Sequence, residues 1–235
     1  MKEIEKLAAS VMEKSVDAKE VAGVNLLVLK DKAPVLSLQA GYADLENKVL
    51  MADDTIMRLY SMSKPVTAAC MMILMQRGLV DLNDPVSKFI PAFANQTYVN
   101  GNTLSLVQRQ MTVHDLLFMT SGLSYGSDSA AGKATSDLFA EMDARLSTKD
   151  AMTTREFADR VGKNPLEFEP SSNFMYGISA DILGALIEVI SGMSFAEFFK
   201  RKRSQILLRC QIQAFSFLRK SSLVFLRFMH ALKMD

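Results

Sequence analysis

The sequence predicts an α+β fold in which an antiparallel β-sheet is flanked by helices. Three observations support this prediction: a helical pattern at the N-terminus, two strand patterns that follow it as a hairpin, and further helical patterns up to about residue 200. The chain has 235 residues, 49% of them apolar and 23% charged, which suits one globular domain with a sizeable core.

The first elements are a helix over residues 4–16 and a β-hairpin. Apolar side chains repeat at helical spacing in the predicted helix, at Ile4, Leu7, Ala8 and Val11. Residues 24–29 and 34–41 are the runs expected of two strands, and residues 30–33 form the turn between them. A polar loop is expected over residues 41–47.

The later elements are mostly helical. Residues 66–75 are apolar nearly all round, which predicts a helix buried on every side, and Gly78 is placed to end it. Residues 82–91 predict a turn and a short helix with a scaffold role. Residues 180–191 predict another helix, with Gly192 just past its end.

Composition narrows the function classes. Two cysteines, Cys70 and Cys210, argue against a disulfide scaffold, and Cys70 is expected to be a small core residue. The two histidines form no Cys/His cluster, so no metal site is expected. Residues 1–19 lack the apolar core of a signal peptide, and no stretch has the apolar length of a membrane span. The predicted location is therefore cytoplasmic.

The net charge of +1 is unevenly distributed. Residues 201–235 hold eight of the 27 basic residues and one of the 26 acidic ones, so they carry +7 and the first 200 residues carry −6. The predicted boundary between two parts of the chain therefore lies near residue 200.

Ser61 precedes Lys64 by three residues, at the start of the apolar run. Because proline is tolerated only in the first turn of a helix, Pro65 predicts that the helix begins near Ser61. Positions three apart share a helix face, so the hydroxyl and the amine should lie side by side. A serine becomes nucleophilic when a neighbouring base accepts its proton, and burial lowers the pKa of a lysine enough to make it a base. The S-x-x-K spacing also occurs by chance in many proteins.

Three segments together resemble the β-lactamase-related serine hydrolases, the group of AmpC-type β-lactamases, penicillin-binding DD-peptidases and family VIII carboxylesterases. Residues 58–67 (R-L-Y-S-M-S-K-P-V-T) resemble the segment of its nucleophile. Residues 111–123 resemble the family's I-T-I-x-x-L-L-x-H-T-S-G-L, with Met119 in the place of the histidine. Residues 164–179 resemble its P-L-x-F-x-P-G-x-x-W-x-Y-S-x segment. The resemblance runs from about residue 22 to residue 199.

This resemblance implies the roles of the site residues. Ser61, Lys64 and Tyr176 are the predicted catalytic residues, with Tyr176 relaying the proton of the serine. Ile178 is the substrate-binding residue that the resemblance implies, and Tyr125, in a loop flanked by glycines, is predicted to line a substrate cleft. The β-lactamases carry an asparagine at the place of Ile178, and losing its amide favours ester over β-lactam hydrolysis. His114 is expected at the surface, and the small polar residues 127–136 are expected to form a mobile loop beside the cleft.

The resemblance also implies a β-lactamase/transpeptidase-like fold with a helical subdomain, whose remaining sheet strands follow residue 199. The family's D-P-L-x-M-x-D-T-G-F segment and its third motif, K-T-G or H-x-G, are absent there. Residues 205–215, read in a second frame, permit D-P-L-K-M-P-D-T-G-F. We therefore predict that residues 1–200 are the N-terminal part of the family domain, and that a frameshift produced residues 201–235. The alternative is a basic, apolar tail that binds membrane or nucleic acid.

The predicted function is that of a serine hydrolase acting through an acyl-enzyme on a small-molecule ester or β-lactam-like amide. A carboxylesterase is the first choice, and a β-lactamase or DD-peptidase is the alternative. A non-catalytic product with a binding tail is the alternative of another class. No metal, organic cofactor or nucleic-acid partner is expected.

Overall fold

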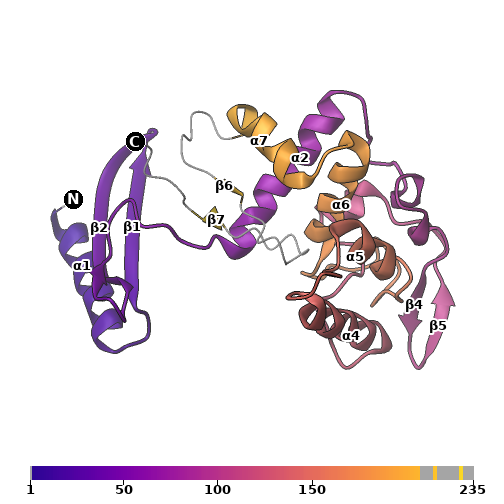
Figure 1. Ribbon diagram of the computed structural model, residues 1–235, viewed down its shortest axis with the longest axis horizontal. Coiled ribbons are helices and arrows are strands. Elements are labelled where there is room, and N and C mark those ends of the chain that lie inside the picture. Colours follow the sequence, from indigo (N-terminus) through magenta and orange to yellow (C-terminus); the bar gives the residue numbers. More distant parts are fainter. Residues whose placement is uncertain (1, 207–213, 216–227, 230–235) are drawn as a thin grey trace. The chain divides into compact units, whose positions relative to one another are not determined.

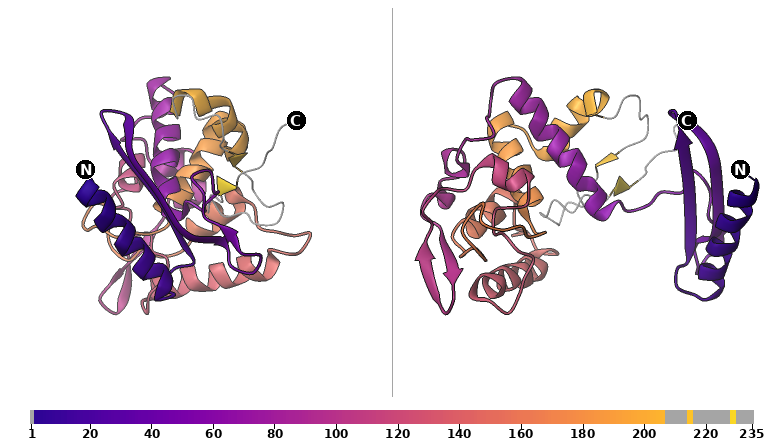
Figure 2. Two further views of the ribbon diagram at one scale, coloured as in Figure 1. Left: turned by 90° about the vertical axis from the view of Figure 1, so that its left-hand side faces the viewer. Right: turned by 180° about the vertical axis from the view of Figure 1, so that it is seen from behind.

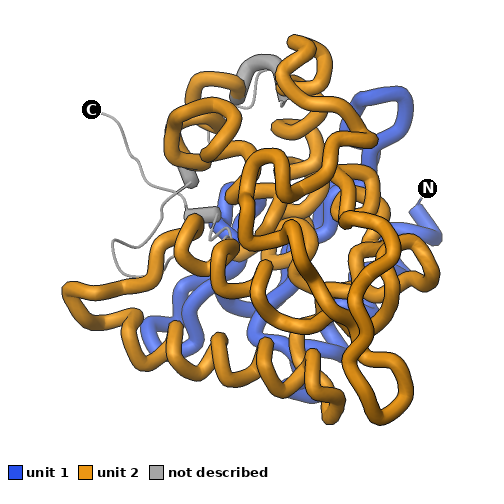
Figure 3. The backbone as a smooth tube through the Cα atoms, turned by 90° about the vertical axis from the view of Figure 1, so that its right-hand side faces the viewer, with its two compact units in different colours: residues 1–57 blue, residues 58–235 orange. Residues whose placement is uncertain are grey.

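The computed structural model describes residues 2–206, 214–215 and 228–229, with side chains described up to residue 202. The chain divides into two compact units, Met1–Met57 and Arg58–Asp235, which are coloured separately in Figure 3. Most of the predicted tail, residues 207–213, 216–227 and 230–235, lies outside the described part, and its predicted frameshift origin stays a prediction.

The first unit is a helix packed on a small antiparallel sheet (Figure 1). Helix α1 (Lys2–Asp17) contacts the hairpin of β1 (Gly23–Lys30) and β2 (Ala33–Asp44). The turn residues Asp31 and Lys32 both have positive φ, 51° and 67°, as two-residue hairpin turns favour. The predicted helix and hairpin are confirmed.

The predicted polar loop over residues 41–47 is wrong in its first half. Strand β2 continues to Asp44 and pairs with a third strand, β3 (Val49–Leu50), through Tyr42 opposite Leu50. The turn between them is held by the Asp44 carboxylate, which accepts hydrogen bonds from the backbone of Glu46 and Asn47. Strand β2 therefore extends three residues beyond the predicted strand, which ended at residue 41.

The second unit is mainly helical (Figures 1 and 2). Its described elements are, in order, 3₁₀ turn η1 (Tyr60–Ser63), α2 (Lys64–Gln76), η2 (Val86–Lys88), η3 (Pro91–Phe93), β4 (Thr97–Asn100), β5 (Thr103–Leu106), α3 (Val113–Leu117), α4 (Ala130–Arg145), α5 (Thr154–Val161), α6 (Ser179–Ser191), α7 (Phe195–Ile206), β6 (Ala214–Phe215) and β7 (Phe228–Met229). The short strands form two separate pairs, β4 with β5 and β6 with β7.

Helix α6 is the centre of this unit. It contacts α2, α3, α5 and α7, and all of its residues from Ser179 to Ile187 are buried. Gly192 ends it with a φ of +67°, as predicted. Among the described helices none is long and apolar enough alone to cross a membrane, although α6 and the first part of α7, bent by 78°, reach that length and composition as a pair.

Two predictions about the helices need correction. Helix α2 is buried on one face, through Thr67, Cys70, Met71 and Leu74, whereas Met72 is 54% exposed. Burial raises the pKa of the Cys70 thiol to about 12, so Cys70 is the inert core residue that was expected. The predicted loop over residues 127–136 is helical from Ala130 onward, because Ser129 caps α4 by accepting a hydrogen bond from the Gly132 amide at 2.9 Å.

Candidate active site

Ser61 and Lys64 meet at the start of α2, as their spacing predicts. The turn that carries Ser61 is the 3₁₀ turn η1, which leads directly into α2 at Lys64. The Lys64 amine donates a hydrogen bond to Ser61 Oγ at 3.2 Å. Tyr60, immediately before Ser61, has a φ of +44°, a conformation that residues other than glycine rarely adopt.

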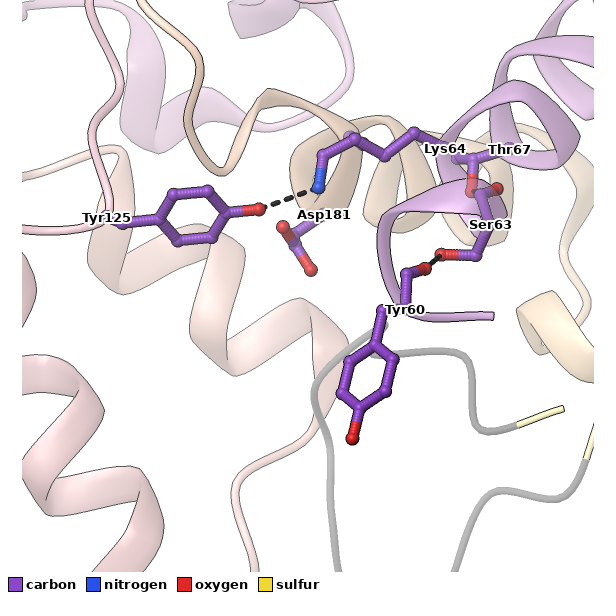
Figure 4. Close-up of a pocket in the computed structure, with 7 residues that line it drawn as sticks. Tyr60, Ser63, Lys64, Thr67, Tyr125 and Asp181 are labelled. Carbon is purple, nitrogen blue, oxygen red and sulfur yellow. Dashed lines mark hydrogen bonds between the residues drawn. The ribbon is translucent and has the colours of Figure 1, made fainter. Parts of the chain in front are cut away.

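The neighbouring serine is not available for the same chemistry. Ser63 is buried, and its hydroxyl donates a hydrogen bond to the Tyr60 carbonyl at 2.5 Å (Figure 4). Ser61 is exposed and lies one turn from the amine. Of the two serines in the motif, Ser61 is therefore the one placed to react with a small molecule.

Tyr125 reaches the same lysine from the segment after α3. The Lys64 amine donates a hydrogen bond to the Tyr125 hydroxyl at 2.7 Å (Figure 4). Burial raises the pKa of the Tyr125 phenol, although Lys64 acts in the opposite direction. The residue predicted to line a substrate cleft thus contacts the catalytic lysine predicted from the sequence.

Tyr176 lies on the segment that enters α6, and its ring faces Lys64. The Lys64 nitrogen is 4.7 Å from the centre of the Tyr176 ring, and the rings of Tyr176 and Tyr125 are 6.1 Å apart. A hydrogen bond with the Ser61 side chain lowers the pKa of the Tyr176 phenol, and the hydrogen bond and charge of Lys64 act in the same direction. The structure therefore brings the three predicted catalytic side chains together.

The pKa of Lys64 is shifted in the opposite direction to the lowering expected from the sequence. Burial acts to lower it, as expected, but hydrogen bonds and charge interactions with Tyr125 and Tyr176 outweigh burial, and the net pKa is raised. Lys64 is therefore an ammonium at neutral pH. Since the pKa of Tyr176 is lowered, the phenol is the better candidate for the proton acceptor.

Two cavities adjoin these residues. The smaller, of about 10 Å³, has polar groups of Tyr60, Ser63, Lys64, Thr67, Tyr125 and Asp181 in its wall, as Figure 4 shows. The larger, of about 340 Å³, has Ser61, Lys64 and Tyr176 at its polar edge. The rest of its wall is apolar and consists of Pro65, Ala68, Leu116, Leu117, Met119, Ala180 and Leu183.

Three further residues singled out from the sequence are Ile178, His114 and Met119. Ile178 is completely buried in the hydrophobic core and lines neither cavity, so its prediction as a substrate-binding residue is corrected. His114 stacks on Phe118 at 4.3 Å and lines neither cavity. Met119, in the place of the family's histidine, lines the larger cavity with a φ of +58°. Within the described residues, no group of three His, Cys, Asp or Glu could hold a metal ion.

Sequence reasoning missed Asp181, an acid in the first turn of α6 that lines the smaller cavity. The available signal was a carboxylate in the first turn of a mainly apolar helix, five residues after Tyr176.

Comparison with known proteins gives consistent matches. The sequence model of the family described as Beta-lactamase matches residues 8–208. Esterase EstB of Burkholderia gladioli is 29% identical over 192 residues, which cover 80% of this chain and 45% of EstB. The solved structure of "EstCE1, a hydrolase with promiscuous acyltransferase activity" is 27% identical, has a TM-score of 0.71, and covers 89% of this chain and 52% of that one.

A second solved structure, the octameric penicillin-binding protein homologue from Pyrococcus abyssi, is 26% identical with a TM-score of 0.67. It covers 88% of this chain and 43% of that one. The chain thus spans about half the length of the relatives that it matches. These matches bear out the resemblance and the fold class predicted from the sequence.

Proposed function

The chain belongs to the Beta-lactamase family, and we propose that it is a serine hydrolase that cleaves carboxylic esters through a covalent acyl-enzyme. The observation that carries this proposal is the position of the Lys64 amine, which is hydrogen-bonded to Ser61 and Tyr125 and faces the ring of Tyr176. The similarity to EstB and to EstCE1, both named as ester-cleaving or acyl-transferring proteins, supports it.

In the proposed reaction, Ser61 Oγ attacks the ester carbonyl and its proton passes to the phenolate oxygen of Tyr176. The ammonium of Lys64 stabilises that phenolate. When the tetrahedral intermediate collapses, the bond to the alcohol breaks and Tyr176 returns the proton to the departing alkoxide. Water then attacks the Ser61 ester, giving one proton to Tyr176, which passes it to Ser61 Oγ as the acid leaves.

The larger cavity favours an apolar acyl group. Its polar edge holds Ser61, Lys64 and Tyr176, and the remaining wall is formed by aliphatic and methionine side chains. An acyl group bonded to Ser61 would shield that wall from water. Each methylene of the acyl chain that is buried there contributes about 0.8 kcal/mol to the binding free energy.

The decisive test is covalent labelling with a fluorophosphonate. We expect one label on the peptide that contains Ser61, detected by intact-protein and peptide mass spectrometry, because the reagent reacts with activated serines. Ser61→Ala should abolish the label. Ser63→Ala is the matched control, since it removes a serine two residues away, and it should keep the label. Folded wild-type protein that stays unlabelled would refute the proposal.

Acyl-chain length tests the substrate class. For p-nitrophenyl esters from acetate to hexanoate we expect kcat/KM to rise by up to about fourfold for each methylene, the factor that corresponds to its burial. Ala68→Leu, which fills the cavity, should lower kcat/KM for hexanoate and leave acetate nearly unchanged. Ala69→Leu places the same side chain on α2 at a position that does not line the cavity. Rates that do not depend on acyl length would contradict an acyl site there.

A β-lactam or peptide substrate is the second candidate. The similarity to the penicillin-binding protein homologue supports it. A fluorescent penicillin that labels Ser61 faster than the fluorophosphonate does would favour this alternative over the esterase.

A further inference from the structure

Asp181 is a buried acid that the proposed reaction does not use. It lies in the first turn of α6 with 6% of its surface exposed, in a helix whose other buried residues are mainly apolar. A buried carboxylate is costly unless a charge or hydrogen bonds compensate for it. Lys64 is the cation whose charge acts on it.

The carboxylate of Asp181 lies behind Lys64 rather than at the reaction centre. It lines the smaller cavity together with Lys64, Thr67 and Tyr125, and Figure 4 shows it facing the space between the Lys64 amine and the Tyr125 hydroxyl. With a volume of about 10 Å³, this cavity has room for nothing larger than a water molecule. Asp181 does not line the larger cavity beside Ser61. Its charge interacts with Lys64 and also acts to raise the pKa of the Tyr125 and Tyr176 phenols.

We propose that Asp181 is a positioning residue whose buried carboxylate is the counter-charge of Lys64, keeping that amine protonated and directed at Ser61 and the two tyrosines. The pairing of the two charges is a property of the folded chain and does not depend on the proposed function. Only the effect of this pairing on the reaction rests on that function. Without the counter-charge, the amine would lose its proton more easily and would stabilise the Tyr176 phenolate less.

The other groups that face Lys64 are consistent with this arrangement. Tyr125 faces it from the segment between α3 and α4, Tyr176 from the segment before α6, Asp181 from α6 and Ser61 from η1. Burial raises the pKa of Asp181 to about 7, and Lys64 opposes the rise. Above that pH the carboxylate is ionised while the amine is still protonated, so the two charges coexist over the pH range between their two pKa values.

The experiment measures the pKa of Lys64 directly and needs no enzymatic activity. Full-length protein is acetylated briefly with acetic anhydride between pH 7 and pH 11, and the modified Lys64 peptide is quantified by mass spectrometry. In Asp181→Asn we expect the titration midpoint of Lys64 to fall by about one pH unit, so that the free amine is about tenfold more abundant at a given pH. Circular dichroism checks that each variant is folded.

Glu188→Gln is the matched control. Glu188 is also on α6, burial likewise raises its pKa, and it accepts a hydrogen bond from the Phe195 amide, but it lines neither cavity. Its replacement should leave the midpoint of Lys64 unchanged. If Asp181→Asn does not fold, Asp181→Ser removes the same charge with a smaller polar side chain and should give the same shift.

A midpoint of Lys64 that is the same in wild type and in a folded Asp181 variant overturns the proposal. The pH profile of fluorophosphonate labelling supplies the functional arm, in which the alkaline limb should move to lower pH in Asp181→Asn but not in Glu188→Gln. A wild type that takes no label would refute the hydrolase function alone, because the titration of Lys64 would still decide the role of Asp181.

Discussion

Replacing Tyr176 by phenylalanine is expected to slow the acylation of Ser61 by about 10²–10⁴-fold, the usual contribution of a positioned acid or base. The Tyr176 ring lies 4.7 Å from the Lys64 nitrogen, and interactions with Ser61 and Lys64 lower the pKa of its phenol. Because the phenolate accepts the proton, the wild-type rate should rise with pH through the pKa of Tyr176. The variant should lose this rise. The measurement is the second-order rate of fluorophosphonate labelling from pH 6 to pH 10.

Tyr125→Phe is the matched control for this prediction. It removes a second phenol hydroxyl from the same lysine, at 2.7 Å, while the ring stays in place. A hydrogen bond with a charged group contributes about 1.5–3 kcal/mol, so we expect a loss of about 10- to 150-fold, smaller than the loss in Tyr176→Phe. A larger loss in Tyr125→Phe than in Tyr176→Phe would mean that Tyr125, and not Tyr176, is the proton acceptor.

The parts of the site that follow from local spacing could be predicted from the sequence. Ser61 and Lys64 are three residues apart, and a 3₁₀ turn or an α-helical turn brings such positions together equally well. Tyr176 was found through the matched residues around it, although 112 positions separate it from Lys64. The direction of the Lys64 pKa could not be predicted, because it depends on Tyr125 and Tyr176, which only the tertiary structure places beside the amine.

The same division applies to the fold. The β1–β2 hairpin and α6 are set by local patterns and were predicted with nearly correct bounds. The β4–β5 hairpin carried no clear alternation, and part of its support is tertiary, since Val99 donates a backbone hydrogen bond to Leu166. The exposure of Met72 on α2 was missed for a related reason. An apolar composition indicates that a helix can be buried, but the neighbouring elements determine which of its faces is buried.

Gly177 explains how two distant segments reach one lysine. A Cβ atom on this residue would lie 1.9 Å from the Leu123 carbonyl oxygen and 3.0 Å from the Ser124 Cα, both on the backbone. The segment that carries Tyr125 and the segment that carries Tyr176 therefore touch at a point where no side chain fits. Because both contacts are with backbone atoms, a larger residue must push the two segments apart.

Gly177→Ala is therefore expected to damage both stability and the site. Overpacking of this kind costs about 1–3 kcal/mol in the free energy of unfolding, measured by urea denaturation. A displacement of about 1 Å at a reacting group costs on the order of 10²-fold in rate, so the labelling of Ser61 should fall by that factor in the folded fraction.

Gly101→Ala is the control for Gly177→Ala. It also replaces a glycine of the second unit, and its φ of +61° carries a conformational cost, but nothing lies within 4 Å of the added Cβ. We expect a loss of about 1–2 kcal/mol from backbone strain and no change in labelling. Equal labelling rates in Gly177→Ala and Gly101→Ala would mean that the contact between the two segments does not position the tyrosines.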